Sequence, residues 1–257
     1  MGAKTGLLVY ADGDVGGILR AAPAPDRDAT AALLDRLYPG WSVQEDKPST
    51  LGDGCYPPYG TTYATSLPGL DIVCDQRVML GEPSRLPARL VEAGAGRRLV
   101  LHAMHSVVDW LAFAVWEDGR LVRSLSLSPD NGVIENIGEP FPFEAPYWAG
   151  EHPVPHDPVW TEEPYPLPFH PLDLGEDALR GLLGFVLEGE VRPDDADPHE
   201  VELLGFRLTD PSDPDEVARH KAEIAEAVSR MGPPRRFTYG ADGSLIEITA
   251  EGPGDQR

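Results

Sequence analysis

The sequence predicts one α+β domain with a mainly antiparallel sheet, flanking helices and a belt rich in proline and aromatic residues. Three observations predict it. Residues 98–128 alternate as strands do, helical patterns lie on both sides of them, and ten prolines fall between residues 140 and 171. We expect the domain to span residues 1–250 and the last residues, 251–257, to be frayed.

The first part of the chain mixes short strand and helix patterns. Residues 5–12 form a short apolar run that ends in a polar turn, which is typical of a buried strand. Residues 28–38 place Leu33, Leu34 and Leu37 on one helical face, and the helix is expected to end at Pro39. The other elements expected here are a short strand at 41–44, a Tyr- and Gly-rich loop at 51–64, a strand at 70–74 and a short helix at 84–93.

The clearest strand signal is a three-stranded meander. Its strands are expected at 98–104, 111–116 and 121–127. An Asp-Gly turn at 118–119 joins the last two, and the strict alternation in the third predicts two unequal faces.

Residues 140–171 carry too many prolines for a regular helix or a central strand. The same segment holds seven Phe, Tyr and Trp residues, and side chains of this kind bury large apolar areas. We therefore expect a belt packed over the sheet, with a disordered linker as the alternative.

The C-terminal part predicts two helices, a strand and a hairpin. Residues 174–187 show one apolar helical face closed by Gly189. Residues 201–208 favour a strand with Gly205 as a bulge. A helix is expected to start at 213–216, with Val217, Ile224, Val228 and Met231 as its apolar stripe, and a hairpin is expected at 237–249.

The charge balance excludes several classes of partner. The chain has 43 acidic and 21 basic residues, which gives a formal net charge of −22. Nucleic acids and anionic membrane surfaces require clustered Lys and Arg, so we expect neither as a partner. No apolar stretch is long enough for a membrane helix and the N-terminal pattern is not that of a signal peptide, so we expect a cytoplasmic protein with Cys55 and Cys74 reduced. Acidic residues concentrate at 188–202 and 209–226, an acidic C-terminal flank.

Asp12 and Asp14 follow the first expected strand. A strand that ends in Asp-x-Asp resembles the first motif of haloacid-dehalogenase-like phosphatases. The resemblance implies a nucleophile at Asp12, an acid/base at Asp14 and a bound magnesium ion. The later motifs of that family are not found, and a polar turn after the strand is the alternative interpretation. The neighbouring segment Gly13–Gly17 lacks the spacing of a phosphate-binding loop and is also expected to be a turn.

His102, His105 and Asp109 are the other catalytic candidates. The two histidines lie three residues apart on an expected strand, so they point to opposite faces and are not expected to chelate one metal. His152 and His156 have a similar spacing in the belt. Nothing in the spacing brings these groups, or the thiols of Cys55 and Cys74, together, and we expect no metal and no cofactor.

Tyr56, Tyr59 and Tyr63 cluster around Cys55 in the expected loop. Ligand pockets typically have aromatic walls and a few polar groups, such as hydroxyls. These tyrosines are therefore candidate ligand-binding residues. Packing of the core is the alternative interpretation.

Several segments resemble a family of actinobacterial cytoplasmic proteins, a domain of unknown function. They are residues 1–12, 102–110, 122–129, 135–138 and 146–150. The resemblance implies a single cytoplasmic domain and implies no activity.

Because the sequence holds no complete catalytic set, it favours a non-enzymatic binding or regulatory protein. The acidic flank indicates a basic protein partner, as in an inhibitor or immunity-type protein. The alternative is a metal-dependent, phosphatase-like hydrolase that uses Asp12 and Asp14. The oligomeric state stays open.

Overall fold

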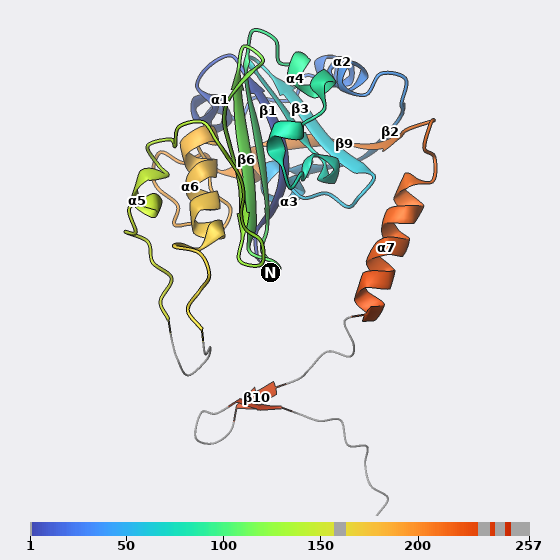
Figure 1. The fold of residues 1–257 in the computed structure, drawn as a ribbon. Coiled ribbons are helices and arrows are strands. Elements are labelled where there is room, and N and C mark those ends of the chain that lie inside the picture. Colours follow the sequence, from blue (N-terminus) through green and yellow to red (C-terminus); the bar gives the residue numbers. More distant parts are fainter. Residues whose placement is uncertain (1, 157–162, 231–236, 240–244, 248–257) are drawn as a thin grey trace, which may run out of the picture. The chain divides into compact units, whose positions relative to one another are not determined.

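The computed structural model describes residues 2–156, 163–230, 237–239 and 245–247 (Figure 1). Contacts divide the chain into two compact units, Met1–Pro214 and Asp215–Arg257, and each is described here by itself. The single domain expected over residues 1–250 stays a prediction, and the tail at 251–257 lies outside the described residues. Among the described residues, no helix has the length and apolar content needed to cross a membrane.

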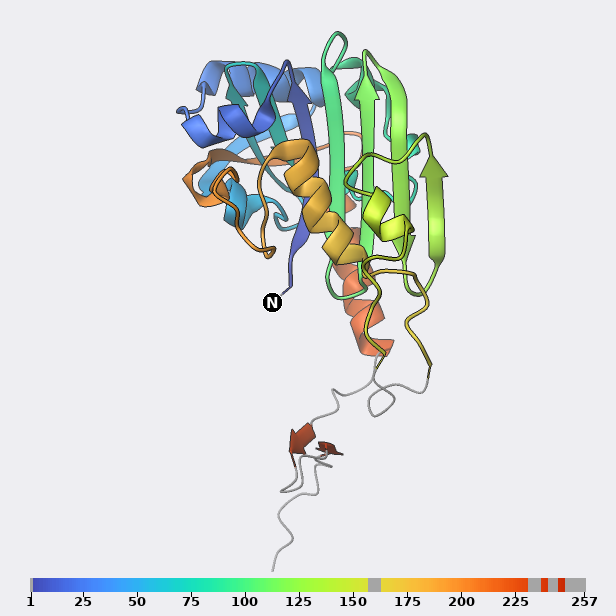
Figure 2. The ribbon, with the colours of Figure 1, turned by 90° about the vertical axis from the view of Figure 1, so that its left-hand side faces the viewer.

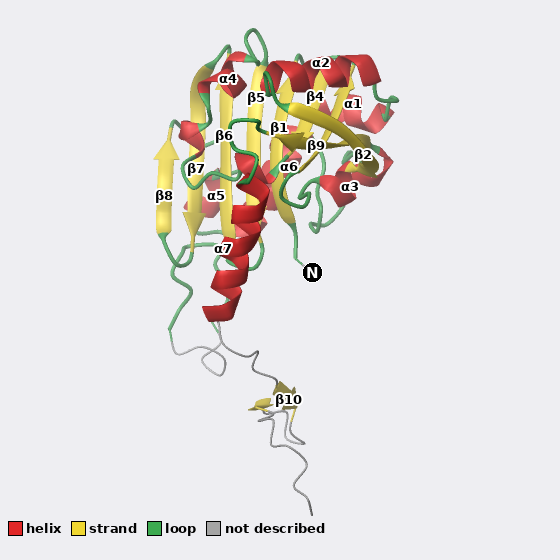
Figure 3. Cartoon of the chain, turned by 90° about the vertical axis from the view of Figure 1, so that its right-hand side faces the viewer, coloured by secondary structure: helices red, strands yellow, loops and turns green. Residues whose placement is uncertain are grey.

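The first unit is built on one antiparallel sheet of nine strands, which confirms the α+β class. The strand order is β2-β9-β3-β4-β1-β5-β6-β7-β8, so β2 and β8 are the edges (Figure 3). The strands are β1 (Lys4–Ala11), β2 (Ser42–Thr50), β3 (Thr61–Leu67), β4 (Leu70–Cys74), β5 (Arg98–His105), β6 (Trp110–Glu117), β7 (Arg120–Ser128), β8 (Gly132–Ile137) and β9 (Glu202–Thr209).

Helices cover both faces of this sheet. The longest, α6, runs diagonally across one face (Figure 2), and α2 and α4 pack on the other. The helices of the first unit are α1 (Val15–Ala21), α2 (Arg27–Leu37), α3 (Leu51–Gly54), α4 (Ala88–Glu92), α5 (Ala145–Trp148) and α6 (Pro171–Leu183). Single 3-10 turns lie at η1 (Gln76–Val78), η2 (Pro83–Arg85) and η3 (Pro198–Glu200).

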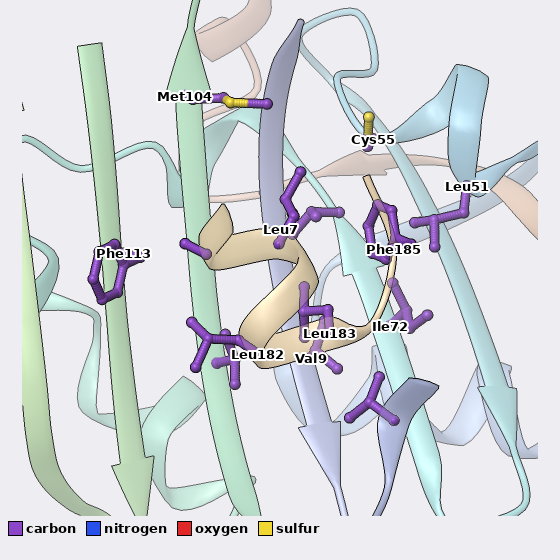
Figure 4. Close-up of a cluster of buried hydrophobic side chains, with 14 of the residues drawn as sticks. Leu7, Val9, Leu51, Cys55, Ile72, Met104, Phe113, Leu182, Leu183 and Phe185 are labelled. Atoms are coloured by element: carbon purple, nitrogen blue, oxygen red, sulfur yellow. The ribbon is translucent and has the colours of Figure 1, made fainter. Parts of the chain in front are cut away.

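The alternation along β1 explains why the unit has two hydrophobic cores. Leu7 and Val9 face α6 and join the cluster that contains Leu183 and Phe185 (Figure 4). Leu8 and Tyr10 point the other way, into the cluster that contains Leu33, Leu34 and Leu37 of α2. A strand buried on both faces is apolar along its whole length. For this reason the apolar run at the start of the sequence predicts β1.

The proline-rich belt packs against the α6 face of the sheet in its described parts. Tyr147, Leu167 and Phe169 are buried there, and Trp148 meets Phe169 edge to face with ring centroids 5.0 Å apart. These packed residues belong to the segment 140–171, whose residues 149–153 are by contrast exposed. The belt also contains the single helical turn α5, with Pro146 in its first turn, so the expectation that proline excludes a helix from this segment was wrong there.

The second unit contains α7 (Glu216–Arg230) and the hairpin strands β10 (Phe237–Tyr239) and β11 (Leu245–Glu247). The helix and the hairpin were both expected. Met231, the last member of the expected apolar stripe, and the turn between the two hairpin strands lie outside the described residues.

The sequence analysis missed or misplaced several elements. The expected loop at 51–64 begins with α3 and ends in β3, a strand whose partners are β4 and the distant β9. β8 was not expected; it is an edge strand that pairs only with β7, and most of its residues are exposed. Local propensity carries little information about such long-range pairs.

One turn prediction and two helix predictions were also wrong in detail. The turn expected at Gly13–Gly17 is instead the start of α1, which begins at Val15. The helix expected at 84–93 is divided at Pro87 into η2 and α4. α6 starts earlier than expected, with Pro171 at its first position, and ends at Gly184, whose φ of +78° favours glycine.

Candidate functional site

Asp12 lies just beyond the end of β1 and is held by an arginine. Its Oδ1 accepts a hydrogen bond from Nε of Arg97 at 3.0 Å. The same guanidinium donates to Asp71 at 2.6 Å and to the carbonyl of Tyr10 at 2.7 Å. Asp12 therefore takes part in a cross-strand ion-pair network and shares the Arg97 guanidinium with Asp71.

Asp14 precedes α1 and is mostly exposed. Its side chain is 78% exposed and makes no capping hydrogen bond, and its closest cation is Arg20, at 3.9 Å. The strand register puts Asp12 and His105 at opposite ends of β1, because Ala11 pairs with Arg98 and Lys4 pairs with His105. At about 3.3 Å per strand residue, the eight positions between Lys4 and Asp12 correspond to about 26 Å. The two carboxylates therefore do not meet the histidines.

His102 is a structural residue of the core. It is fully buried, with Nδ1 at 2.8 Å from the hydroxyl of Thr5 and Nε2 at 3.0 Å from the carbonyl of Gly175 in α6. A carbonyl only accepts, so Nε2 carries the proton and Nδ1 accepts from Thr5. Burial lowers the pKa of His102 to about 4, so the ring is neutral at physiological pH. Both ring nitrogens of His102 are therefore engaged in hydrogen bonds within the core.

His105 and Asp109 flank the turn between β5 and β6. His105 meets the ring of Tyr56 edge to face at 5.7 Å, and burial together with the nearby Lys4 lowers its pKa. Asp109 has a positive φ of 45° and lies 3.5 Å from Nε2 of His170. The two candidates thus have separate partners, and the five predicted catalytic residues do not form one cluster.

The two thiols lie in the core, and His152 lies against an aromatic ring of the belt. Cys55 and Cys74 are free and buried, and burial raises the pKa of Cys55 to about 12. His152 stacks on Tyr147 at 4.2 Å. Within the part of the chain that the structure describes, no group of three His, Cys, Asp or Glu residues is arranged to hold a metal ion.

Of the three candidate tyrosines, Tyr56 lines a recess. Tyr56 and Cys55 form part of the wall of a recess of about 630 Å³ beside the N-terminal end of β1. Tyr59 instead lies under the guanidinium of Arg77, at 5.2 Å, and Tyr63 packs against the hydrophobic core. The recess, which we call the Tyr56 recess, takes its apolar wall from Ala3, Cys55, Tyr56, Val107 and Leu187.

The charged lining of the Tyr56 recess comes from four separate segments. Lys4 stands over the ring of Tyr56, with Nζ 5.4 Å from its centroid. Asp53 of α3 lies 3.8 Å from Nδ1 of His199, and Glu188 lines the recess from the segment after α6. The recess therefore combines an apolar wall with two carboxylates and one ammonium group.

Exposed carboxylates continue from the recess along one sheet edge. The backbone amide of Leu51 donates to Val201 at 2.9 Å, which holds α3 beside η3. Glu200 and Glu202 are exposed on this neighbouring segment, and Glu202 pairs in register with Thr50 of edge strand β2. We call the surface formed by Asp53, Glu188, Glu200 and Glu202 the acidic face.

The sheet, both cores and the Tyr56 recess fall almost entirely within one family match. A model for a family of unknown function, DUF6928, matches residues 5–206. The chain belongs to the DUF6928 family. The match begins at β1 and ends within β9, so it covers the nine-stranded sheet that defines the first unit and excludes α7 and the hairpin. No curated protein and no solved structure matches the chain.

Sequence reasoning missed most of the recess. Lys4, Asp53, Glu188 and His199 come from segments up to 195 residues apart, and no local motif joins them. One signal was available, because Lys4 is one of only three lysines in the chain.

Proposed function

We propose that this member of the DUF6928 family is a non-enzymatic cytoplasmic binding protein that docks a basic protein partner on the acidic face. The observation that carries the proposal is the position of Asp53 and Glu188. Both carboxylates line the Tyr56 recess, and Glu200 and Glu202 extend the same negative surface along the sheet edge.

The recess and the acidic face have complementary roles in this proposal. The exposed carboxylates attract a basic partner and speed association, as charge complementarity does in other complexes. The apolar wall of the recess then receives one partner side chain, whose methylene groups pack on Tyr56 and Val107 while its charged end meets Asp53 or Glu188. An inhibitor or immunity-type protein would use a surface of this kind.

The test is capture of a partner by the immobilised full chain from a native lysate of the organism that encodes it, at low and at high salt. We expect a basic protein to be retained at low salt and released at high salt. The triple variant D53N/E200Q/E202Q should lose it. A matched triple variant, E92Q/E117Q/D130N, replaces exposed acids elsewhere on the first unit and should retain it.

Equal capture by both triple variants, or no basic protein captured by the wild type, would overturn the proposal. Thermal unfolding of each variant checks that the fold is intact. None of the replaced carboxylates is buried, so all variants should unfold near the wild-type temperature.

The hydrolase stays a prediction from the sequence, and no contact of the described residues favours it. Asp12 is engaged by Arg97, and Asp14 is exposed beside Arg20. A panel of phosphate monoesters with magnesium, run on the wild type and on Asp12→Asn, decides it. Turnover that is lost in Asp12→Asn would establish the hydrolase in place of the binding protein.

A further inference from the structure

The opposite end of β1 carries a second recess with very different electrostatics. Its volume is about 400 Å³, and it lies between the start of α1, the end of α6 and residues 192–195. Here α1 and α6 touch through their backbones, since a Cβ built on Gly184 would lie 2.5 Å from Cα of Gly16. Four guanidinium groups from four separate segments line it, and we call it the arginine recess: Arg20, Arg98, Arg180 and Arg192.

This concentration of arginine is unusual for a chain with a net charge of −22. The three carboxylates in the lining, Asp14, Asp194 and Asp195, leave the recess with a formal charge of +1 from four arginines and three aspartates. Asp177, which pairs with Arg180 at 2.9 Å just outside this lining, brings the sum to zero, so the arginine recess is near neutral on a strongly negative molecule, which favours an anion at this point over the rest of the surface.

Arg180 and Asp195 are held in position in the wall of the recess by hydrogen bonds. Arg180 donates to Asp195 at 3.1 Å, to Asp177 at 2.9 Å and to the carbonyl of Glu190 at 2.5 Å. Burial raises the pKa of Asp195, but the amide of Arg192 and the guanidinium of Arg180 more than offset this and lower it below its usual value. Asp195 is therefore ionised, and its oxygens already accept hydrogen bonds from Arg180 and from the amide of Arg192. It does not compete with a ligand for the other guanidinium groups.

Arg98 and Arg192 are the two guanidinium groups of this recess that form no ion pair within 4.0 Å among the described residues. Nε of Arg98 is buried and makes no hydrogen bond within the described part of the chain, and its guanidinium carbon lies 5.9 Å from the centroid of the Phe141 ring. Arg192 is exposed, and among the described residues its guanidinium has no carboxylate within 4.0 Å. Arg20 is partly engaged, through the carbonyl of Asp194 at 2.6 Å and Asp14 at 3.9 Å. A buried donor without an acceptor costs free energy, which an oxyanion in the recess would recover.

We propose that the arginine recess binds the phosphate monoester of a small hydroxylated molecule, such as a sugar phosphate. Guanidinium groups from several directions suit the three acceptor oxygens of a phosphate dianion, because each planar fork donates two parallel hydrogen bonds. The exposed carboxylates of Asp14 and Asp194 are acceptors for hydroxyl groups on the rest of the ligand. The helix α1 has only seven residues, and its N-terminus has no part in the proposal.

The test is isothermal titration of the full chain with ribose 5-phosphate, inorganic phosphate and ribose. We expect ribose 5-phosphate to bind most tightly, inorganic phosphate more weakly and ribose not measurably. Arg98→Met keeps the apolar stem and removes the unpaired donor, so it should weaken binding of ribose 5-phosphate by about tenfold or more. Arg192→Gln should weaken it severalfold, and because the side chain is exposed the substitution leaves the fold unchanged.

Arg120→Gln is the matched control. Arg120 is an exposed arginine at the start of β7, without a carboxylate within 4.0 Å among the described residues, and its loss should leave binding unchanged. Wild-type affinity in both Arg98→Met and Arg192→Gln would overturn the site, as would a wild type that binds no phosphate compound. Equal affinity for inorganic phosphate and ribose 5-phosphate would overturn the role of Asp14 and Asp194. This site is independent of the acidic face, so neither result bears on the partner-capture experiment.

Discussion

Arg123 and Glu144 form a two-point ion pair in which both side chains are completely buried. Nε of Arg123 donates to Oε1 of Glu144 at 2.9 Å, and Nη2 donates to Oε2 at 2.6 Å. The remaining donors of Arg123 reach Asn136 at 2.6 Å and the carbonyl of Ile137 at 2.9 Å. Since Arg123 belongs to β7 and Glu144 to the belt, this pair fastens the belt to the sheet.

Glu144→Gln should destabilise the first unit by about 3–5 kcal/mol, because it leaves the Arg123 charge buried without its counter-charge. Urea unfolding at neutral pH measures this free energy. The control Glu151→Gln changes an exposed belt residue and should stay within about 0.5 kcal/mol of the wild type. Equal stability of the two variants would show that the pair does not hold the belt.

Stability should fall on acidification because of His102. Burial lowers the pKa of His102 from 6.5 to about 4, so between these values the unfolded chain binds a proton that the folded chain does not. The stability contributed above pH 6.5 is therefore lost as the pH falls towards 4, by up to about 3 kcal/mol.

The measurement is chemical unfolding at several pH values between 7 and 4.5, for the wild type and for His102→Gln, whose side chain does not titrate. Buried Asp75 opposes the trend, since burial raises its pKa and its contribution grows as the pH falls. The difference between the two unfolding free energies at each pH cancels the contributions of Asp75 and of every other group that both proteins share. Parallel pH profiles would contradict the buried neutral state of His102.

Gly184→Ala should cost much more than Gly150→Ala, although both glycines have nearly the same φ, +78° and +79°. At Gly150 nothing lies within 4 Å of an added Cβ, so the cost is the left-handed backbone alone, about 1–2 kcal/mol. At Gly184 the Cβ overlaps the backbone of Gly16, which adds about 1–3 kcal/mol. Thermal or urea unfolding compares the two, and equal losses would mean that α1 does not pack against the end of α6.

The two native thiols should resist alkylation in the folded protein. Burial raises the pKa of Cys55 to about 12 and holds that of Cys74 well above its ordinary value, so neither is a thiolate at neutral pH. Mass spectrometry after iodoacetamide should find both unmodified until urea is added. Val107→Cys introduces a thiol at a position that is 70% exposed, and this one should react at once. Rapid labelling of Cys55 in the folded wild type would contradict its burial at the Tyr56 recess.

Local patterns in the sequence were sufficient for much of the fold. The meander from β5 to β7, the buried strand β1 and the helix α2 all follow from short-range alternation or helical spacing. Those signals are reliable because each element is buried on a face that its own periodicity defines. In the belt, Tyr147 and Phe169 are buried, and their apolar area stabilises a segment that has little regular structure apart from α5.

The sites were decided by tertiary structure, because charge pairing acts between residues that are far apart in the chain. Asp12 and Asp14 resemble a catalytic pair in the sequence, but Arg97, 85 residues beyond Asp12, engages the first of them. The arginine recess joins residues 20, 98, 180 and 192, and no spacing rule connects these positions. The sequence by itself determined β1, α2, the meander from β5 to β7 and the strongly acidic charge of the chain. Which carboxylates are neutralised and which guanidinium groups stay unpaired depended on the strand order, which brings the ends of β1, β5 and α6 together.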